Sequence, residues 1–431
     1  MDLWNLTLRE LAAGVREKRH TAAEVARAHA ARIDALEPKV KAWVALDAER
    51  AIARAEVLDS TGPLAGVPLA IKDIIDVAGL PTRCGSPIYE SAAVAKRSAA
   101  CVTALENAGG VIFGKSVTTE FAYYTPRKTR NPWNLKHTPG GSSMGSAAAV
   151  ACGMVAGALG TQTNGSVIRP AAFCGVVGFK PSFGAISNDG TMDPWPTLDH
   201  TGVFARNVAD AATLAAVVAA DVSAAVAPPR EPPRIAVVRT PVWPAATAAQ
   251  REMLAGNADA FERAGAKIDE LELPAAFEGA LEVHRTILAY EGAKYFGPLQ
   301  EKHALDMGAQ INALIDYGMK IEEAAYREAL AAAAALRETF ARTYDGYDAI
   351  VTPPSTGEAP ATLAETGSPA FCTIWTLLGV PAIAIPVALG AAGLPLGLQI
   401  VGRHAEDDRV LAVAAWCEGL LGGAVRTPVT P

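Results

Sequence analysis

An α/β fold with a mixed, mostly parallel central sheet, covered by helices on both faces, is predicted from three observations. Short apolar runs of strand length alternate with helical segments along the 431 residues. Hydrophobic residues make up 50% of the chain and charged residues 19%, which is typical of a globular protein with a large core. No internal repeat or low-complexity tail interrupts the pattern. We therefore predict a single domain over residues 1–431.

Residues 1–60 predict a layer of helices. Thr21 suits a helix N-cap, and apolar residues follow it at roughly helical spacing. These residues are Val25, Ala28, Ile33 and Leu36. The next element, residues 66–71, is a short apolar run bounded by glycine, which predicts a buried strand. Lys72 would stand at the end of this strand.

The same alternation predicts the remaining elements. Further strands are expected at 111–113, 158–161, 235–238, 349–351, 382–387 and 396–401, and helices at 99–108, 146–154, 321–344 and 407–420. The proline-rich stretch 227–233 interrupts the pattern and predicts a surface connection. Strands mixed with helices over the whole length favour one sheet with helices on each side.

Charge and cysteine usage exclude several classes of protein. The net charge of −7 and the absence of a basic stripe argue against nucleic-acid binding. The start of the chain lacks the basic and apolar regions of a signal peptide. Two long uncharged runs, 138–168 and 366–402, are too polar or too proline-broken for membrane spans. Six scattered cysteines indicate buried free thiols: Cys84, Cys101, Cys152, Cys174, Cys372 and Cys417. We expect a cytoplasmic protein.

Residues 109–116 match the phosphate-loop pattern GxxxxGK[ST], but the structural context that this motif needs is missing. A phosphate loop follows a strand and offers open backbone NH groups, whereas here the strand-forming residues 111–113 lie inside the supposed loop. We therefore reject a nucleotide hydrolase. Lys115 is interpreted as an ordinary residue at a strand end.

Two glycine-rich segments, 140–149 and 160–170, each contain a serine that could carry chemistry. Ser142 and Ser166 are separated by 24 positions, and Lys72 lies upstream. A serine hydroxyl needs an adjacent base to become a nucleophile, and a buried lysine with a lowered pKa can supply it. Successive NH groups in a glycine-rich turn suit an oxyanion hole. By themselves, however, such residues equally form a flexible turn or a helix N-terminus.

The combination of motifs resembles the amidase signature family. Gly-Gly-Ser-Ser-x-Gly-Ser at 140–146 is followed by Gly-Ser-x-x-Arg-Pro at 165–170, with Ile-Lys-Asp at 71–73 upstream. The match is dense from Gly62 to Gly202 and returns at 394–402. The resemblance implies the amidase signature fold, with a core at 62–203 and 371–403 and a variable segment at about 240–365 that shapes the substrate pocket.

The resemblance also implies a mechanism and its residues. Lys72 aligns with the catalytic lysine, Ser142 with the bridging serine associated with an unusual cis peptide, and Ser166 with the acylated nucleophile. The backbone NH groups of Thr163, Asn164, Gly165 and Ser166 would form the oxyanion hole. Neutral Lys72 would draw a proton through Ser142 from Ser166, which attacks the amide carbonyl. No metal or organic cofactor is needed, and the histidines show no ligand spacing.

Departures from the family pattern bear on the substrate. Most members have Asp where this chain has Gln162, Gly where it has Asn164, and a small residue where it has Met144. Arginine usually lies two residues after the nucleophile, whereas here Ile168 takes that place and Arg169 follows. This shift is similar to the malonamidase-like branch, in which arginine grips a substrate carboxylate. Arg169 either does the same or forms a structural salt bridge.

We therefore expect an amidohydrolase acting on a small-molecule amide, with a preference for small amides that bear a free carboxylate. Two alternatives stay open: a glutaminase-type subunit of a tRNA-dependent amidotransferase, and a catalytically silent anion-binding protein on the same fold. Three aromatic residues either line the pocket or belong to the core: Tyr123, Tyr124 and Trp195. No nucleic-acid or membrane partner is expected, and a homodimer stays open.

Overall fold

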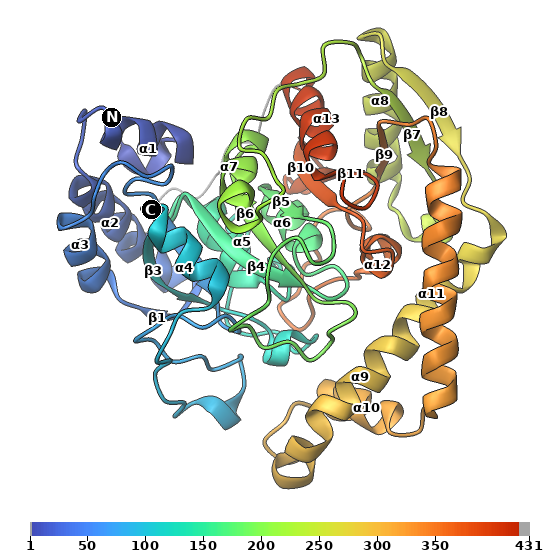
Figure 1. Cartoon of the computed structure of the whole chain (residues 1–431), viewed down its shortest axis with the longest axis horizontal. Helices are drawn as coiled ribbons and strands as arrows, with labels where there is room; N and C mark the ends of the chain where they lie inside the picture. The colour runs from blue at the N-terminus through green and yellow to red at the C-terminus, as the bar shows by residue number, and fades with distance from the viewer. Residues whose placement is uncertain (1, 422–431) are drawn as a thin grey trace.

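The computed structural model describes residues 2–421. Eleven strands of this part form one sheet, in the order β1-β3-β2-β4-β6-β5-β10-β11-β9-β7-β8 (Figure 1). Their bounds are β1 (Trp43–Leu46), β2 (Pro68–Lys72), β3 (Val111–Ser116), β4 (Gly157–Gln162), β5 (Val177–Lys180), β6 (His200–Ala205), β7 (Arg234–Val238), β8 (Lys267–Leu271), β9 (Ala349–Thr352), β10 (Ala382–Leu389) and β11 (Pro395–Val401). The division into domains stays a prediction.

The sheet is mixed, and the expectation that it is mostly parallel is wrong. Parallel pairing is confined to β2 with β3 and β4, and to β7 with β8 and β9. The other neighbouring strands run antiparallel. One cause is the pair β5 and β6, which the sequence pattern did not predict and which lies antiparallel between β4 and β10. Another is the short turn after Leu389, which folds β11 back on β10 as a hairpin.

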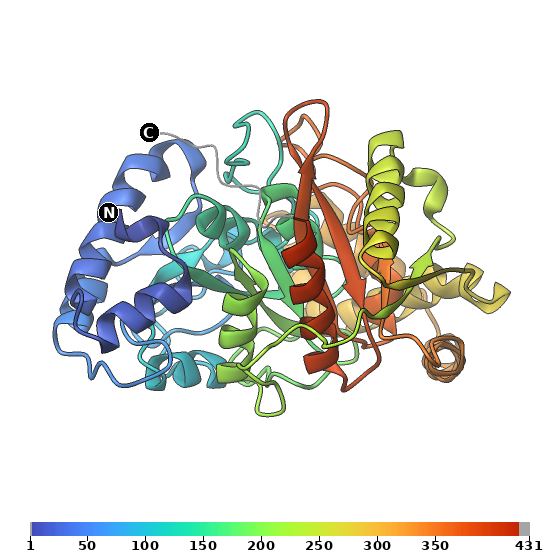
Figure 2. The ribbon, with the colours of Figure 1, turned by 90° about the horizontal axis from the view of Figure 1, so that it is seen from above.

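Helices cover both faces of this sheet (Figure 2). Helices α5 and α6 pack together and against β2, β4, β10 and β11, whereas α7 and α13 pack together over β5, β6 and β10. The helices are α1 (Leu8–Arg16), α2 (Ala22–Val40), α3 (Ala48–Glu56), α4 (Ala100–Asn107), α5 (Met144–Ala151), α6 (Ile168–Cys174), α7 (Val208–Val218), α8 (Ala248–Arg263), α9 (Ala280–His303), α10 (Ala309–Gly318), α11 (Glu323–Thr343), α12 (Ala370–Leu377) and α13 (Asp407–Leu420). Five short 3-10 helices complete the described elements: η1 (Leu3–Asn5), η2 (Pro87–Tyr89), η3 (Glu120–Ala122), η4 (Trp243–Ala245) and η5 (Ala275–Gly279).

The local signals at the N-terminal helices act as predicted. Thr21 caps α2: its hydroxyl accepts from the NH of Glu24, and the Glu24 carboxylate accepts from the NH of Thr21. This reciprocal pair satisfies two NH groups at the helix start, which would otherwise lack partners. The apolar stripe of α2, including Val25 and Ile33, is buried in the main core.

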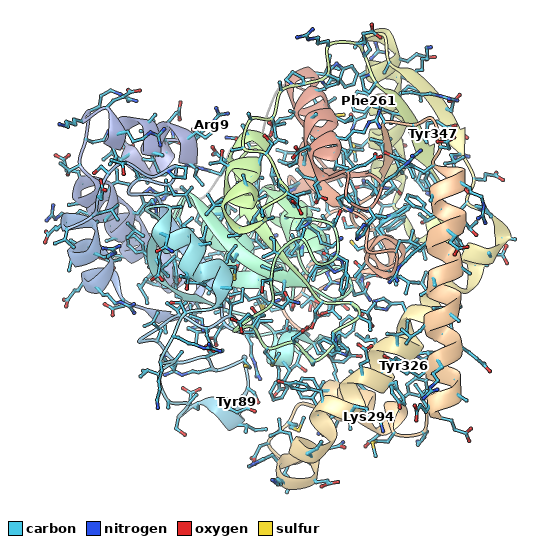
Figure 3. All side chains as sticks on the ribbon, viewed as in Figure 1. Arg9, Tyr89, Phe261, Lys294, Tyr326 and Tyr347 are labelled. Carbon is cyan, nitrogen blue, oxygen red and sulfur yellow. The ribbon has the colours of Figure 1, made fainter. Side chains whose placement is uncertain are left out.

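Helices α9, α10 and α11 form a layer that extends from the sheet toward the lower right of Figure 1. Tyr290 of α9 stacks on Tyr326 of α11 with ring centroids 4.2 Å apart, and Lys294 lies over the Tyr290 ring. Figure 3 labels Tyr326 and Lys294 on their two helices. These contacts fix α9 against α11.

The carboxyl ends of β2 and β4 meet at one edge of the sheet, because the two strands are parallel neighbours. Lys72 ends β2, and the loops before α5 and α6 start from the same region. The carboxyl ends of parallel strands are the usual place for ligand sites in α/β proteins. All six cysteines are buried and form no disulfide. Each helix in residues 2–421 is too short or too polar to cross a lipid bilayer.

Candidate active site

Lys72 brings a buried amine to the edge of the sheet. Its side chain is fully buried, and Nζ lies 2.7 Å from Oγ of Ser142 and 2.6 Å from Oγ1 of Thr161. Burial lowers the pKa of Lys72 to about 7, while the nearby Asp199 acts in the opposite direction. An amine with this pKa is neutral in a large fraction of molecules at neutral pH, so it can accept a proton.

Ser142 stands in the loop before α5, where the Gly141–Ser142 peptide bond is cis. Two residues from other segments hold this loop. The NH of Thr119 donates to the Ser142 carbonyl at 3.2 Å, and Arg169 donates to the Gly141 carbonyl at 2.8 Å. The Ser142 hydroxyl therefore has a defined position between the Lys72 amine and the open pocket.

Ser166 lies in the loop between β4 and α6 and lines the same pocket as Ser142. Among the hydrogen bonds of residues 2–421, none joins the two serine hydroxyls. The structure therefore brings Lys72 and Ser142 into direct contact and places Ser166 across the same small pocket. Catalytic hydrogen bonds are often long without a substrate and tighten in the complex.

All four residues of the loop 163–166 line this pocket. Outside the helices and strands of the described chain, no hydrogen bond uses the NH groups of Thr163, Asn164, Gly165 or Ser166. Two hydrogen bonds to its carbonyl groups hold the loop in place. Thr376 of α12 donates to the Asn164 carbonyl at 2.5 Å, and Arg169 NH donates to the Gly165 carbonyl at 3.0 Å. Free NH groups on a fixed loop are what an oxyanion hole requires.

Of the departures from the family pattern, Asn164 lies in this loop, Gln162 directly precedes it, and Met144 lies in α5. The Gln162 side chain accepts from the NH groups of Val167 and Ile168 at 2.8 and 3.0 Å, which is a role a carboxylate can also fill. Asn164 does not adopt a positive φ, so a residue with a side chain is accommodated there without strain. Met144 is buried in α5 and is not among the described residues that line the pocket. The site is therefore not crowded by Met144.

Aromatic side chains form the opposite wall. Tyr123, Tyr124 and Trp195 all line the pocket, although Trp195 is almost completely buried. The Trp195 Nε1–H donates to the Leu288 carbonyl at 2.8 Å, which fixes the ring beside α9. The sequence left these residues open between pocket and core: all three line the pocket, Trp195 also belongs to the main core, and Tyr123 packs against that core.

Arg169 also lines the pocket, where its side chain is 3% exposed. Its terminal nitrogens donate to the carbonyls of Gly141 and Gly367 at 2.8 Å and to the Thr366 hydroxyl at 3.2 Å. Among the described residues, no carboxylate forms an ion pair with it, and its Nε has no partner. Burial lowers the pKa of this guanidinium, but arginine stays charged. Of the two roles left open for Arg169, the structural salt bridge is not formed among the described residues, and its contacts are to two backbone carbonyls and one hydroxyl.

Two contributors to the site carried no signal in the sequence. Thr161 contacts the Lys72 amine, and Asp199 accepts a hydrogen bond from the Thr163 hydroxyl and one from the Trp195 NH. Burial raises the pKa of Asp199 well above its usual range. The Asp199 carboxyl therefore links Thr163 of the loop 163–166 to Trp195, which lines the pocket. Only the position of Asp199 just before β6 could have suggested this role, and β6 was not predicted.

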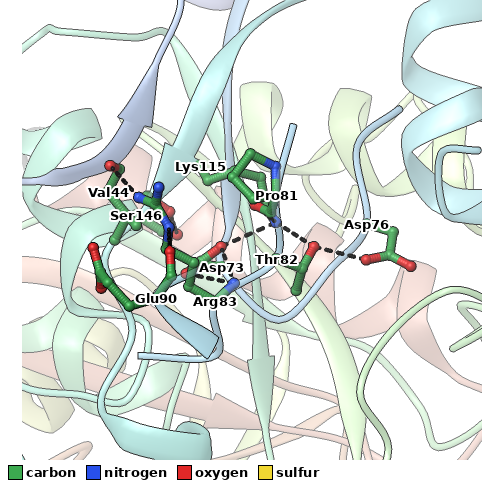
Figure 4. A network of polar contacts seen from close by, with 10 residues as sticks. Val44, Asp73, Asp76, Pro81, Thr82, Arg83, Glu90, Lys115 and Ser146 are labelled. Atoms are coloured by element: carbon green, nitrogen blue, oxygen red, sulfur yellow. Dashed lines mark hydrogen bonds and ion pairs between the residues drawn. The ribbon is translucent and has the colours of Figure 1, made fainter. Parts of the chain in front are cut away.

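Lys115, the lysine of the rejected phosphate-loop match, forms a buried ion pair behind the site (Figure 4). Its Nζ lies 3.1 Å from Oδ1 of Asp73, and both side chains are fully buried. Lys115 also donates to the Thr82 hydroxyl at 2.7 Å. Because Asp73 directly follows Lys72 on the chain, this pair fixes the end of β2 from the side opposite the pocket.

Removing one partner of this pair should destabilise the fold. The variant Lys115→Met leaves the Asp73 carboxylate buried without its cation, and we expect its free energy of unfolding to fall by about 3–5 kcal/mol. The double variant Lys115→Met/Asp73→Leu removes both charges and should recover most of that loss. Urea-induced unfolding measures both. A single variant as stable as the parent would show that the pair has no such role.

The comparisons with known proteins place this site in a family. The model described as Amidase matches residues 24–411, nearly the whole chain. The chain belongs to the amidase family. A glutamyl-tRNA(Gln) amidotransferase subunit from Halothermothrix orenii is 31% identical to it over 99% of this chain and 100% of that protein.

Solved structures of amidases are similar to this chain over nearly its full length. A structure described as an amidase superposes with a TM-score of 0.89 at 31% identity, covering 97% of this chain and 100% of that one. The peptide amidase from Stenotrophomonas maltophilia gives a TM-score of 0.85 at 27% identity, with 99% of each chain covered. The amidase signature resemblance is thus confirmed, and the chain is an amidase-signature hydrolase in this general sense.

Proposed function

We propose that this amidase hydrolyses carboxylic amides through an acyl-enzyme on Ser166. The observation that carries the proposal is the buried contact between Lys72 and Ser142 at 2.7 Å, beside a pocket that Ser166 lines. Neutral Lys72 takes the Ser142 proton while Ser142 takes that of Ser166. The Ser166 oxygen then bonds to the carbonyl carbon, and the NH groups of loop 163–166 hold the oxyanion.

The same relay completes the reaction. When the C–N bond breaks, the leaving nitrogen receives the proton through Ser142, and an ester on Ser166 remains. Water then attacks the ester carbonyl and gives its proton to the relay, so that the carboxylic acid leaves and Ser166 regains its hydroxyl. Every step uses side chains and NH groups that line the pocket or touch Lys72.

Within this chemistry we propose a preference for small amides that bear a free carboxylate, as in malonamidase-like members of the family. Arg169 supports this preference, because it places a buried positive charge without a carboxylate partner at the pocket wall. A half-amide such as malonamate should be hydrolysed faster than a neutral alkyl or aryl amide of the same size. Ammonia release across such a panel measures this, and faster turnover of the neutral amides would overturn the preference.

A component of a tRNA-dependent amidotransferase is the second candidate, and the curated relatives favour it. The relatives named as subunits of glutamyl-tRNA(Gln) amidotransferase match this chain at 31–33% identity over nearly its full length. The first of these alignments spans 484 positions against 431 residues, so that relative has segments without a counterpart here. Both candidates share the amide-cleaving chemistry and differ in the need for a protein partner.

Purified chain assayed alone separates the candidates. A free-standing amidohydrolase releases ammonia from amides without added protein, whereas a glutaminase-type subunit should need its complex. Labelling of Ser166 by a fluorophosphonate probe tests the third possibility, because a catalytically silent anion-binding protein should not react. A cytoplasmic location and a homodimer stay predictions.

A further inference from the structure

The pocket that Ser166 lines adjoins a second, larger chamber. The inner pocket has a volume of about 30 Å³, and the outer chamber about 570 Å³. A water molecule needs roughly 10–15 Å³ by this measure, so the inner pocket has room for little more than the scissile group. Five residues line both spaces: Tyr123, Tyr124, Asn164, Leu288 and Pro369. The two chambers are therefore direct neighbours.

The position of Ser142 decides which end of the amide lies in each chamber. Ser142 would return the proton to the leaving nitrogen, and it lines the inner pocket but not the outer chamber. The nitrogen must therefore lie at the inner end, where little space remains for a substituent on it. The acyl group, on the other side of the carbonyl carbon, points toward the outer chamber. This geometry favours primary amides, which release ammonia.

Apolar side chains dominate the wall of the outer chamber. Helix α9 contributes Leu281 and Leu288, α10 contributes Ala313, Leu314 and Tyr317, and α12 contributes Ala370. Chambers of this size and lining bind organic ligands by removing their apolar surface from water. Each methylene buried there improves binding by about fourfold, which is roughly 0.8 kcal/mol converted to a ratio.

The charges along both chambers disfavour a cationic substrate. Among the described residues, neither lining contains Asp or Glu, and its charged members are Arg169 and Arg285. His284 also lines the outer chamber, but burial lowers its pKa to about 4, so it is neutral at neutral pH. Glu282 lies 3.5 Å from Arg285 on the exposed side of α9 and is not part of the lining. An ammonium group would thus find no carboxylate in either lining, and in the inner pocket it would meet the buried positive charge of Arg169.

We propose that the substrate is a primary amide with an apolar acyl arm and no ammonium group. The scissile amide lies in the inner pocket, and the arm lies in the outer chamber between α9, α10 and α12. This inference rests on the proposed amide hydrolysis. It is an alternative to the preference for small half-amides, because Arg169 lines only the inner pocket, which the scissile group fills, and the half-amide panel decides between the two.

A series of primary amides with increasing chain length tests whether the acyl arm binds in the outer chamber. We expect kcat/KM for ammonia release to rise from acetamide to octanamide, by up to about fourfold per methylene until the chamber is filled. The variant Ala313→Trp fills part of the outer chamber, and it should lower kcat/KM for octanamide at least tenfold more than that for acetamide. Ala331→Trp, an exposed substitution on α11 away from both chambers, should leave both values unchanged. A flat series, or equal losses for both amides in Ala313→Trp, would overturn the arm.

A matched pair of substrates tests the charge. Glutamine and glutaramate differ only in the ammonium group, and we expect glutaramate to be hydrolysed at least tenfold faster. Equal or faster turnover of glutamine would overturn this part of the inference and support the amidotransferase reading. If the proposed function itself is wrong, no amide in either set is hydrolysed and the fluorophosphonate probe leaves Ser166 unlabelled, a result distinct from activity without chain-length or charge dependence.

Discussion

Replacing Ser166 with alanine should lower kcat for amide hydrolysis by a factor on the order of 10⁴–10⁶. The hydroxyl is the proposed attacking group, and Ser166 belongs to the loop 163–166 whose NH groups are proposed to hold the oxyanion. In the variant, water could attack the amide carbonyl directly, but the reaction would then proceed without a covalent intermediate. The oxyanion hole alone would then provide the remaining acceleration.

The measurement compares ammonia release by the two proteins with their thermal unfolding. Ser166 is buried, and among the hydrogen bonds of residues 2–421 none uses its hydroxyl, so Ser166→Ala should unfold at the same temperature as the parent. Ser187→Ala, at an exposed serine outside the pocket, is the matched control and should retain full activity. Substantial amidase activity in a folded Ser166→Ala variant would remove Ser166 from its assigned role.

Local features of the fold could be predicted because their causes are local. Thr21 caps α2 with a residue three positions away, and the apolar run before Lys72 forms a buried strand, as its composition indicated. The direction of the strands could not be predicted in this way. Strand direction depends on where the long connection between β5 and β6 re-enters the sheet, and no short sequence motif determines this.

In the candidate site, too, some residues could be predicted from the sequence and others could not. The loops around Ser142 and Ser166 were recognised because family motifs mark them, whereas Thr161 and Asp199 were not. Thr161 contacts Lys72 across 89 positions of sequence, and Asp199 reaches Thr163 across 36. Such partners are set by the pairing of β4 with its neighbours, since Thr161 lies on β4 and Asp199 directly precedes β6. The contacts of Arg169 could not be predicted either, because its partners Gly141 and Gly367 lie on loops that are far apart in the sequence.

Activity should rise with pH through about 7 and reach a plateau above it, because the relay needs the neutral amine of Lys72. Burial lowers the pKa of Lys72 to about 7, so below this pH the amine carries a proton and cannot accept another. The acid limb of kcat/KM reports the free enzyme, which is the state described here. A profile that is flat between about pH 5.5 and 8.5 would contradict this assignment.

The variants Lys72→Arg and Lys72→Met separate the charge of this residue from its basicity. Arginine keeps a positive charge but cannot lose its proton, whereas methionine removes the charge and the base together. If Lys72 acts as a base, both variants should lose roughly 10²–10⁴-fold in kcat. If it acts only as a cation near Ser142, Lys72→Arg should retain most of the activity. Because Thr161 and Ser142 both contact the amine, each variant also needs a thermal unfolding measurement, so that a loss of rate is assigned to the missing base and not to a collapsed site.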